Sequence, residues 1–206
     1  MAASRVAGLT GATLSTVPAV CHGCVWWQSR SSRTTDKSRW IEHAEEEWGA
    51  WGSIYRDDDG RVLGSMQYGA AELFPRAAEL PAGPPSADAM LVTCAYLVDQ
   101  STPWVLQSLF LTAIGEAREK GAKALETFAY RYAEGESARE RFWMHKTIFP
   151  RDFLGDFGFR TVRSADRVEL VRLELGGLQA VAEGRRAHVL RVVEEAFQPA
   201  PVPQRP

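Results

Sequence analysis

The stretch Ala89-Met90-Leu91-Val92-Thr93-Cys94-Ala95-Tyr96-Leu97-Val98 and the two segments after it decide the fold of this chain. A nearly continuous apolar run of this length is typical of a central strand that is buried on both faces. Residues 103–120 follow with an apolar helical stripe made of Val105, Leu109, Ala113 and Ala117. Residues 124–130 again have the composition of a buried strand. A strand, a helix and a strand at this spacing predict a right-handed parallel crossover.

The segments before the crossover predict a helix and a hairpin. A helix is expected from Asp36 or Ser38 to Trp48, because apolar residues recur on one face and a capping residue precedes them. Strand-like residues 51–55 and 61–68 flank Asp57-Asp58-Asp59-Gly60, and an Asp-Gly pair supplies the positive φ of a tight turn. The acidic triplet lacks the spaced ligands and closing Glu of a calcium loop, so we interpret it as a plain turn.

The segments after the crossover complete the predicted fold. Residues 151–156 are expected to form a short helix that ends at Gly158, and residues 159–163 and 168–175 a final strand pair. The order of elements predicts a mixed α/β fold, an α+β mixed sheet with one central parallel strand–helix–strand crossover.

Composition excludes several classes of protein. The chain has 206 residues and a formal net charge of −2, which gives no electrostatic reason to expect a nucleic-acid or anionic-membrane partner. No apolar run approaches the ~20 residues of a membrane-spanning helix. The first twenty residues lack the plan of a secretion signal, and three cysteines cannot form a closed disulfide framework. A cytoplasmic protein is the simplest expectation.

The predicted boundaries divide the chain into four parts. Residues 1–8 are expected to be a flexible N-terminus, 9–177 the folded domain, 178–198 an amphipathic C-terminal helix and 199–206 a disordered tail. The proline-rich residues 73–86 are interpreted as a surface excursion within the domain. The C-terminal helix can pack on its own domain or on a second copy, so a homodimer is one expected assembly.

Several motifs, in this order and spacing, resemble the GNAT acetyltransferase superfamily, in particular an actinobacterial-type, hence bacterial, branch of it. The motifs are Cys21-His22-Gly23-Cys24-Val25-Trp26-Trp27, Trp48-Gly49-Ala50-Trp51-Gly52, Asp88-Ala89-Met90-Leu91, Lys120-Gly121-Ala122-Lys123-Ala124-Leu125-Glu126, Pro150-Arg151-Asp152-Phe153-Leu154 and Gly158-Phe159-Arg160-Thr161-Val162-Arg163. The resemblance covers roughly residues 9–175 and implies a GNAT-like fold.

The resemblance also implies an activity. It is the transfer of an acetyl group from acetyl-CoA to an amine of a small molecule or a protein, with the CoA pyrophosphate at the N-terminus of the crossover helix. The cofactor-binding residues that it implies here are Tyr96, Leu97, Val98, Gln100, Ser101, Thr102, Trp104 and Val105.

The chain departs from the family at the pyrophosphate loop. No glycine lies between Gly83 and Gly115, and Trp104 and Leu106 stand where the family has its glycines. Pro103 also removes one N–H donor. Either CoA binds in an altered pose with Trp104 against it, or Trp104 blocks it and the chain is a non-catalytic binding or regulatory module with the same fold.

Candidate catalytic groups are few. The strand 89–98 contains no carboxylate, so Glu126 on the neighbouring strand is the candidate base, or simply a strand residue. Tyr130 and His145 are candidate acids or bases. Many relatives carry a tyrosine four residues before the Gly-Phe pair, and this position is Leu154 here.

Cys21 and Cys24 form a Cys-x-x-Cys pair. We favour a packing role, with a zinc site second and a redox sensor third, because a zinc site needs two further ligands and a redox pair needs a helix N-terminus. No metal site is therefore predicted.

Overall fold

The predicted crossover forms the centre of the molecule. The computed structural model describes residues 5–99, 103–132 and 149–176. Strand β4 (Ala89–Leu97), helix α3 (Pro103–Glu119) and strand β5 (Ala124–Tyr130) follow one another, and β4 and β5 are parallel. The mixed α/β fold class with one parallel crossover is thus confirmed.

All the strands in the described ranges belong to one sheet, which runs in the order β1-β2-β3-β4-β5-β8-β7, with β6 paired to β5. Besides the parallel pairs β4–β5 and β5–β6, every neighbouring pair in this sheet is antiparallel. The remaining strands are β1 (Val6–Gly8), β2 (Gly52–Arg56), β3 (Val62–Ala70), β6 (Phe149–Pro150), β7 (Arg160–Ala165) and β8 (Val168–Glu174).

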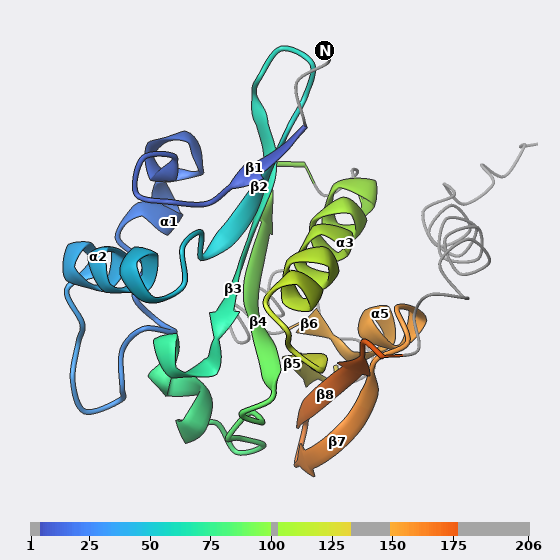
Figure 1. Ribbon diagram of the computed structural model, residues 1–206. Coiled ribbons are helices and arrows are strands. Elements are labelled where there is room, and N and C mark those ends of the chain that lie inside the picture. Colours follow the sequence, from blue (N-terminus) through green and yellow to red (C-terminus); the bar gives the residue numbers. More distant parts are fainter. Residues whose placement is uncertain (1–4, 100–102, 133–148, 177–206) are drawn as a thin grey trace, which may run out of the picture.

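Helices cover both faces of the sheet (Figure 1). Helix α3 and the short helix α5 (Arg151–Asp156) pack on one face, over a core that contains Phe110, Leu125 and Leu154. The short helix α1 (Ala19–His22) and helix α2 (Lys37–Glu47) lie on the opposite face, together with 3₁₀ turns at Leu14–Thr16, Ala71–Leu73 and Pro75–Glu79. The core on this face is rich in aromatic rings, which are Trp27, Trp40, Trp51, Phe74 and Phe128.

The local signals act as predicted. Asp36 caps α2, because its carboxylate accepts a hydrogen bond from the Arg39 N–H at 3.0 Å. Gly60 has φ +80° in the turn between β2 and β3, and Gly121 has φ +75° just after α3. Among the described residues, no helix is long and apolar enough to cross a membrane.

Two predictions at the N-terminal side are wrong. The sequence predicts a flexible N-terminus over residues 1–8, but residues 6–8 form edge strand β1, which pairs with β2 from Val6–Tyr55 to Gly8–Ser53. Residues 73–86 are not a simple surface excursion, because Phe74 and Ala82 are fully buried in the aromatic core. Both segments gain order only from partners far away in the sequence.

Other predictions lie outside the described residues. They are the amphipathic helix at 178–198 and the disordered tail at 199–206.

Candidate functional site

Strands β4 and β5 part in the middle of the sheet. They pair from Ala89–Ala124 to Val92–Thr127 and no further. At the same point β4 contains a bulge, since Val92 pairs with Tyr68 and Cys94 with Gln67, which leaves Thr93 as the extra residue. A bulge bends its strand and increases its twist, so it turns the end of β4 away from β5. We call the region between Thr93–Leu97 and Phe128–Tyr130 the β4–β5 splay.

The splay leaves one edge of β4 without a strand partner. On its other edge, β4 keeps pairing with β3 as far as Leu97, opposite Gly64. The β5 side of the splay is partly filled by β6, which pairs with Ala129 and Tyr130. Within the described residues, no strand pairs with the β5-facing edge of Thr93–Leu97. The N–H and C=O groups on that edge can therefore bind a ligand that contains amides.

An unsatisfied hydroxyl lies where the two strands part. Thr127 is the last β5 residue paired with β4, and its side chain is fully buried. Its Oγ1 has no hydrogen-bond partner among the described residues. A buried hydroxyl without a partner is costly, and such groups are uncommon in folded proteins. Thr127 therefore has an unused hydrogen-bonding group beside the splay.

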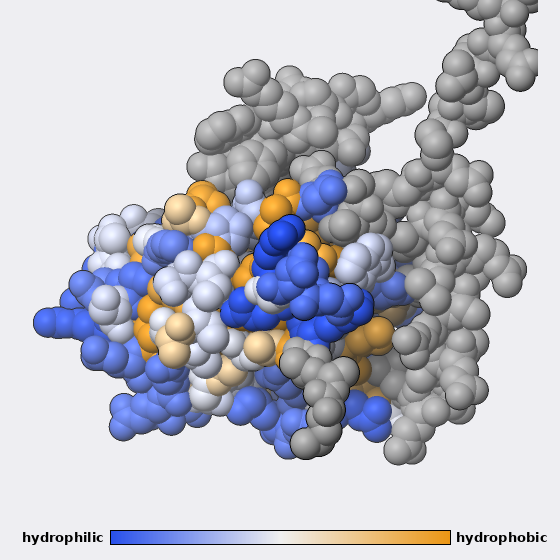
Figure 2. All heavy atoms as spheres, turned by 90° about the horizontal axis from the view of Figure 1, so that it is seen from above, coloured by the Kyte–Doolittle hydropathy of each residue, from blue (hydrophilic) through white to orange (hydrophobic). Residues whose placement is uncertain are grey.

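The predicted cofactor-binding residues on β4 lie at the splay. Tyr96 and Leu97 are half-buried at the end of the strand, and Val98 after it is 56% exposed. Gln100, Ser101 and Thr102 lie outside the described residues. Figure 2 views the molecule from this end, where hydrophilic residues predominate and hydrophobic ones are scattered between them.

Trp104 does not block the splay. The residue is 39% exposed, and its ring meets the Tyr55 ring edge-on, with 5.2 Å between the ring centroids. Tyr55 belongs to β2, which is separated from β4 by β3. The ring of Trp104 therefore leans toward β2 and away from β5, which argues against the blocking interpretation.

Val105 contributes its side chain to the core. It is fully buried, and a Cβ added to Gly64 would lie 2.8 Å from Val105 Cγ1. The first turn of α3 is thus seated directly on β3 at the only residue type that permits this approach. Only the backbone of Val105 is left for a ligand.

Glu126 is part of an ion network and does not line the splay. It pairs with Leu91, within the part of β5 that is still bonded to β4. Its fully buried carboxylate accepts hydrogen bonds from Ser86 N and Oγ, both at 2.7 Å, and from Arg172 Nη1 at 3.1 Å. Arg172 also binds Asp88 and Glu174. A carboxylate held in this way ties the strands together and is poorly placed to accept a substrate proton.

The other predicted catalytic residues fare differently. Tyr130 is buried at the end of β5, where its ring contacts Tyr132 with 5.1 Å between centroids. His145 lies outside the described residues. Leu154, at the position of the family's tyrosine, is fully buried in the core beneath α5.

The structure places Thr93, Gln67 and Cys94 together on the α2 side of the bulge, a grouping that the sequence did not predict. The Thr93 hydroxyl donates to Gln67 Oε1 at 3.0 Å, and the Cys94 thiol lies 3.8 Å from the same oxygen. Burial raises the pKa of Cys94 to about 12, so this thiol stays protonated at neutral pH. Only the bulge, which is a tertiary feature, aims Cys94 to this face, so no pattern in the sequence could have revealed the group.

Lys37 of α2 faces the same region. Its ammonium donates to Cys24 O at 3.0 Å and lies over the rings of Trp40 and Trp51, 4.7 and 5.0 Å from their centroids. Burial is the main effect on the pKa of Lys37, which it lowers. Lys37 is thus a partly desolvated amine within electrostatic range of the bulge.

The two N-terminal cysteines remain free thiols. Cys21 is half-buried and Cys24 is exposed. In the described ranges, no group of three or more His, Cys, Asp or Glu side chains is arranged to hold a metal ion.

Comparison with known proteins finds similarity in structure alone. No protein-family model and no curated protein matches the chain. Similar solved structures include an N-acetyltransferase from Staphylococcus aureus, at 13% identity, a TM-score of 0.46, and coverage of 82% of this chain and 97% of that one. A GCN5-related N-acetyltransferase from Kribbella flavida has 16% identity, a TM-score of 0.42, and coverage of 83% and 97%.

A third similar structure, from Salmonella typhimurium, was solved with its cofactor acetyl-CoA. It has 15% identity, a TM-score of 0.44, and coverage of 85% of this chain and 95% of that one. At these identities and scores, the activity of this chain has to be inferred from its own geometry.

Proposed function

We propose that this protein transfers an acetyl group from acetyl-CoA to an amine of a small molecule or protein. The observation that carries the proposal is the β4–β5 splay, where a bulge at Thr93 coincides with the end of β4–β5 pairing. The sequence resemblance described above supports the same activity. The backbone edge of β4 and the unpartnered Thr127 hydroxyl are suited to the amide-rich pantetheine arm and the thioester.

The splay offers more polar groups to the pantetheine arm and thioester of acetyl-CoA than the start of α3 offers to its pyrophosphate. The arm and thioester find polar groups at the splay, as described. At the pyrophosphate end, α3 offers the positive end of its dipole, but Pro103 contributes no N–H. The pyrophosphate is therefore expected to depend on the helix dipole and on the hydroxyls of Ser101 and Thr102 rather than on a glycine-lined nest.

Direct transfer is favoured over a covalent acetyl-enzyme. A cysteine relay needs a thiolate, whereas the raised pKa of Cys94 keeps its thiol protonated. The acceptor amine must lose a proton to attack the thioester.

The proposal is tested by titrating the full chain with acetyl-CoA and CoA in a calorimeter, and by measuring CoA release with a panel of primary amines. Thr127→Val removes the unpartnered hydroxyl at nearly constant shape, so the variant should be at least as stable as the wild type. It should also bind acetyl-CoA roughly 2- to 10-fold more weakly, because one neutral hydrogen bond contributes about 0.5–1.5 kcal/mol.

Thr112→Val is the matched control, since the Thr112 hydroxyl bonds Ser108 O within α3. It should leave acetyl-CoA affinity unchanged. A wild-type chain that binds neither acetyl-CoA nor CoA would overturn the proposal and favour the non-catalytic module.

A further inference from the structure

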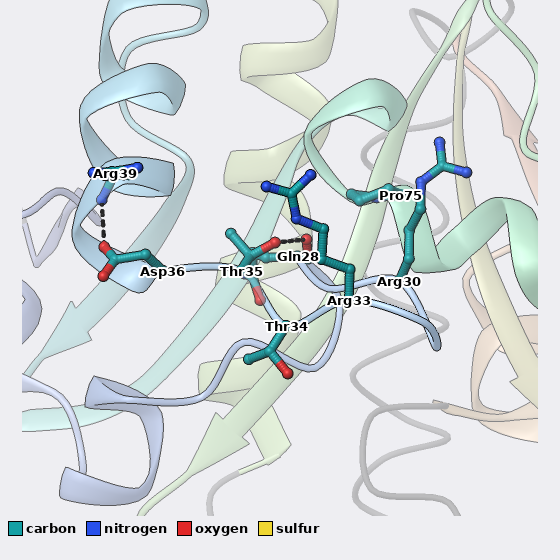
Figure 3. Close-up of a pocket in the computed structure, with 8 residues that line it drawn as sticks. All are labelled: Gln28, Arg30, Arg33, Thr34, Thr35, Asp36, Arg39 and Pro75. Carbon is teal, nitrogen blue, oxygen red and sulfur yellow. Dashed lines mark hydrogen bonds between the residues drawn. The ribbon is translucent and has the colours of Figure 1, made fainter.

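A second candidate site lies away from the splay, in front of helix α2. An open cavity of about 500 Å³ is lined by part of the loop 28–36, by Arg39 in the first turn of α2 and by Pro75 (Figure 3). None of its lining residues belongs to β4 or β5. It lies on the face of the sheet opposite α3 (Figure 1). Its volume is within the range of small-molecule sites, which is about 300–1,000 Å³.

The lining of this cavity is strongly cationic. It contains three arginines, Arg30, Arg33 and Arg39, against one carboxylate, Asp36. The Asp36 carboxylate is already used, because it accepts the Arg39 N–H and caps α2. We refer to the cavity as the arginine pocket.

The three guanidinium groups have no anionic partner among the described residues. None of them forms an ion pair within hydrogen-bonding range there, whereas arginines elsewhere, such as Arg151 and Arg172, do. Glu79 is within electrostatic range of Arg30, and its carboxylate is held by Ser31 N at 2.7 Å and Ser31 Oγ at 2.8 Å. These hydrogen bonds lower the pKa of Glu79, with smaller contributions from Arg76 and Arg30.

The loop that carries two of the arginines is held in place by hydrogen bonds. Arg33 N donates to Arg30 O at 3.2 Å, so the two residues form a bridge. Thr35 N donates to Ser29 Oγ at 3.0 Å, and the Thr35 hydroxyl donates to Gln28 O at 2.9 Å. Gln28 and Ser29 are buried, so this loop is anchored in the core. A pre-ordered loop reduces the entropy that a ligand must overcome on binding.

We propose that the arginine pocket binds a small molecule with two or more carboxylate or phosphate groups. Guanidinium groups bind both kinds of oxyanion through paired, charge-assisted hydrogen bonds. The cavity is lined by three positive charges, which is more than a ligand with a single negative charge would need for binding. The Thr34 and Thr35 side chains in the lining add neutral hydroxyl groups. The site is independent of the proposed acetyl transfer, because it shares no residue with the splay.

The test uses the full chain with citrate, inorganic phosphate and pyrophosphate as probes, at constant ionic strength balanced with chloride. Saturable binding by calorimetry and a matching rise in melting temperature are expected for at least one probe. Arg33→Gln and Arg39→Gln should each weaken that binding about tenfold or more, because each removes a charge-assisted hydrogen bond.

Arg118→Gln is the matched control, since Arg118 is exposed at the end of α3 and the charge change is the same. It should leave anion affinity unchanged, and Arg33→Gln should leave acetyl-CoA affinity unchanged. Failure to bind any of the three probes would overturn the proposal, as would an equal loss in the Arg118 variant. Binding of polyglutamate without binding of the small anions would also overturn it, and would indicate an acidic protein partner.

Discussion

Glu126 offers the sharpest test of the structure, because the sequence proposed it as a base and the structure gives it a different role. Glu126→Gln keeps the volume and one carbonyl oxygen of the side chain but removes its charge. The carboxylate that it replaces is fully buried and accepts hydrogen bonds from Ser86 and Arg172. The amide NH₂ of glutamine would face one of these donors, and Arg172 would lose a buried counter-charge.

The expected loss follows from these contacts. Breaking a buried ion pair by removing one partner typically costs about 3–5 kcal/mol. The ion pair here is of that kind, since the side chains of Glu126 and Arg172 are 0% and 14% exposed. For a domain of this size, each kcal/mol lowers the melting temperature by about 2–4 °C, so a decrease of roughly 6–20 °C is expected.

Thermal unfolding followed by circular dichroism measures this decrease. Glu174→Gln is the control, because Glu174 pairs with the same Arg172 but its side chain is 69% exposed. An exposed pair contributes about 0–1 kcal/mol, so this variant should unfold close to the wild type. Equal melting temperatures for both variants would refute the structural role. A Glu126→Gln protein that keeps its stability but loses acetyl transfer would restore Glu126 as the base.

Three further predictions concern helix α3 and its contacts with the sheet. Burial raises the pKa of Glu116, so the folded protein favours the protonated side chain. The stability of the wild type relative to Glu116→Gln should therefore fall as the pH rises from about 4 through the raised pKa. A difference in melting temperature between the two proteins that stays constant across this pH range would contradict the prediction. Gly64→Ala should lower the free energy of unfolding, measured with denaturant, by about 1–3 kcal/mol, because the added Cβ would collide with Val105. Gly115→Ala is the control: the added Cβ has open space around it in α3, so this variant should not be destabilised. Trp104→Ala should leave the acetyl-CoA affinity measured by calorimetry unchanged. It should lower the free energy of unfolding by at least about 0.5–1.5 kcal/mol, because the ring contact with Tyr55 is lost. Tighter binding of acetyl-CoA by this variant would support the blocking interpretation.

Local chemistry explains why much of the fold was predictable. Helix α5 spans the expected Arg151–Asp156, and α2 begins after Asp36 as its capping signal predicts. The hairpin turn has its positive φ at Gly60. Each of these elements is specified by residues a few positions apart, so a single sequence contains the information.

The errors came from segments whose order depends on distant partners. Strand β1 is three residues long and has no strand pattern of its own, and it exists because β2 offers an edge. Phe74 lies in a segment whose four prolines suggest a surface loop, but its ring packs against Trp40 in the aromatic core. Neither partner can be read from the neighbouring residues.

The sequence by itself determined the β4–α3–β5 crossover, because buried strands and an apolar helical stripe have periodicities that act locally. The sequence also shows that the start of α3 lacks the glycines expected from the family resemblance. Only the tertiary structure decided what surrounds that crossover. The bulge at Thr93 separates β4 from β5, the Trp104 ring leans on β2, Glu126 is neutralised by Arg172, and three arginines gather at one cavity. These features arise from contacts between residues far apart in the chain, and such contacts leave no periodic trace in the sequence.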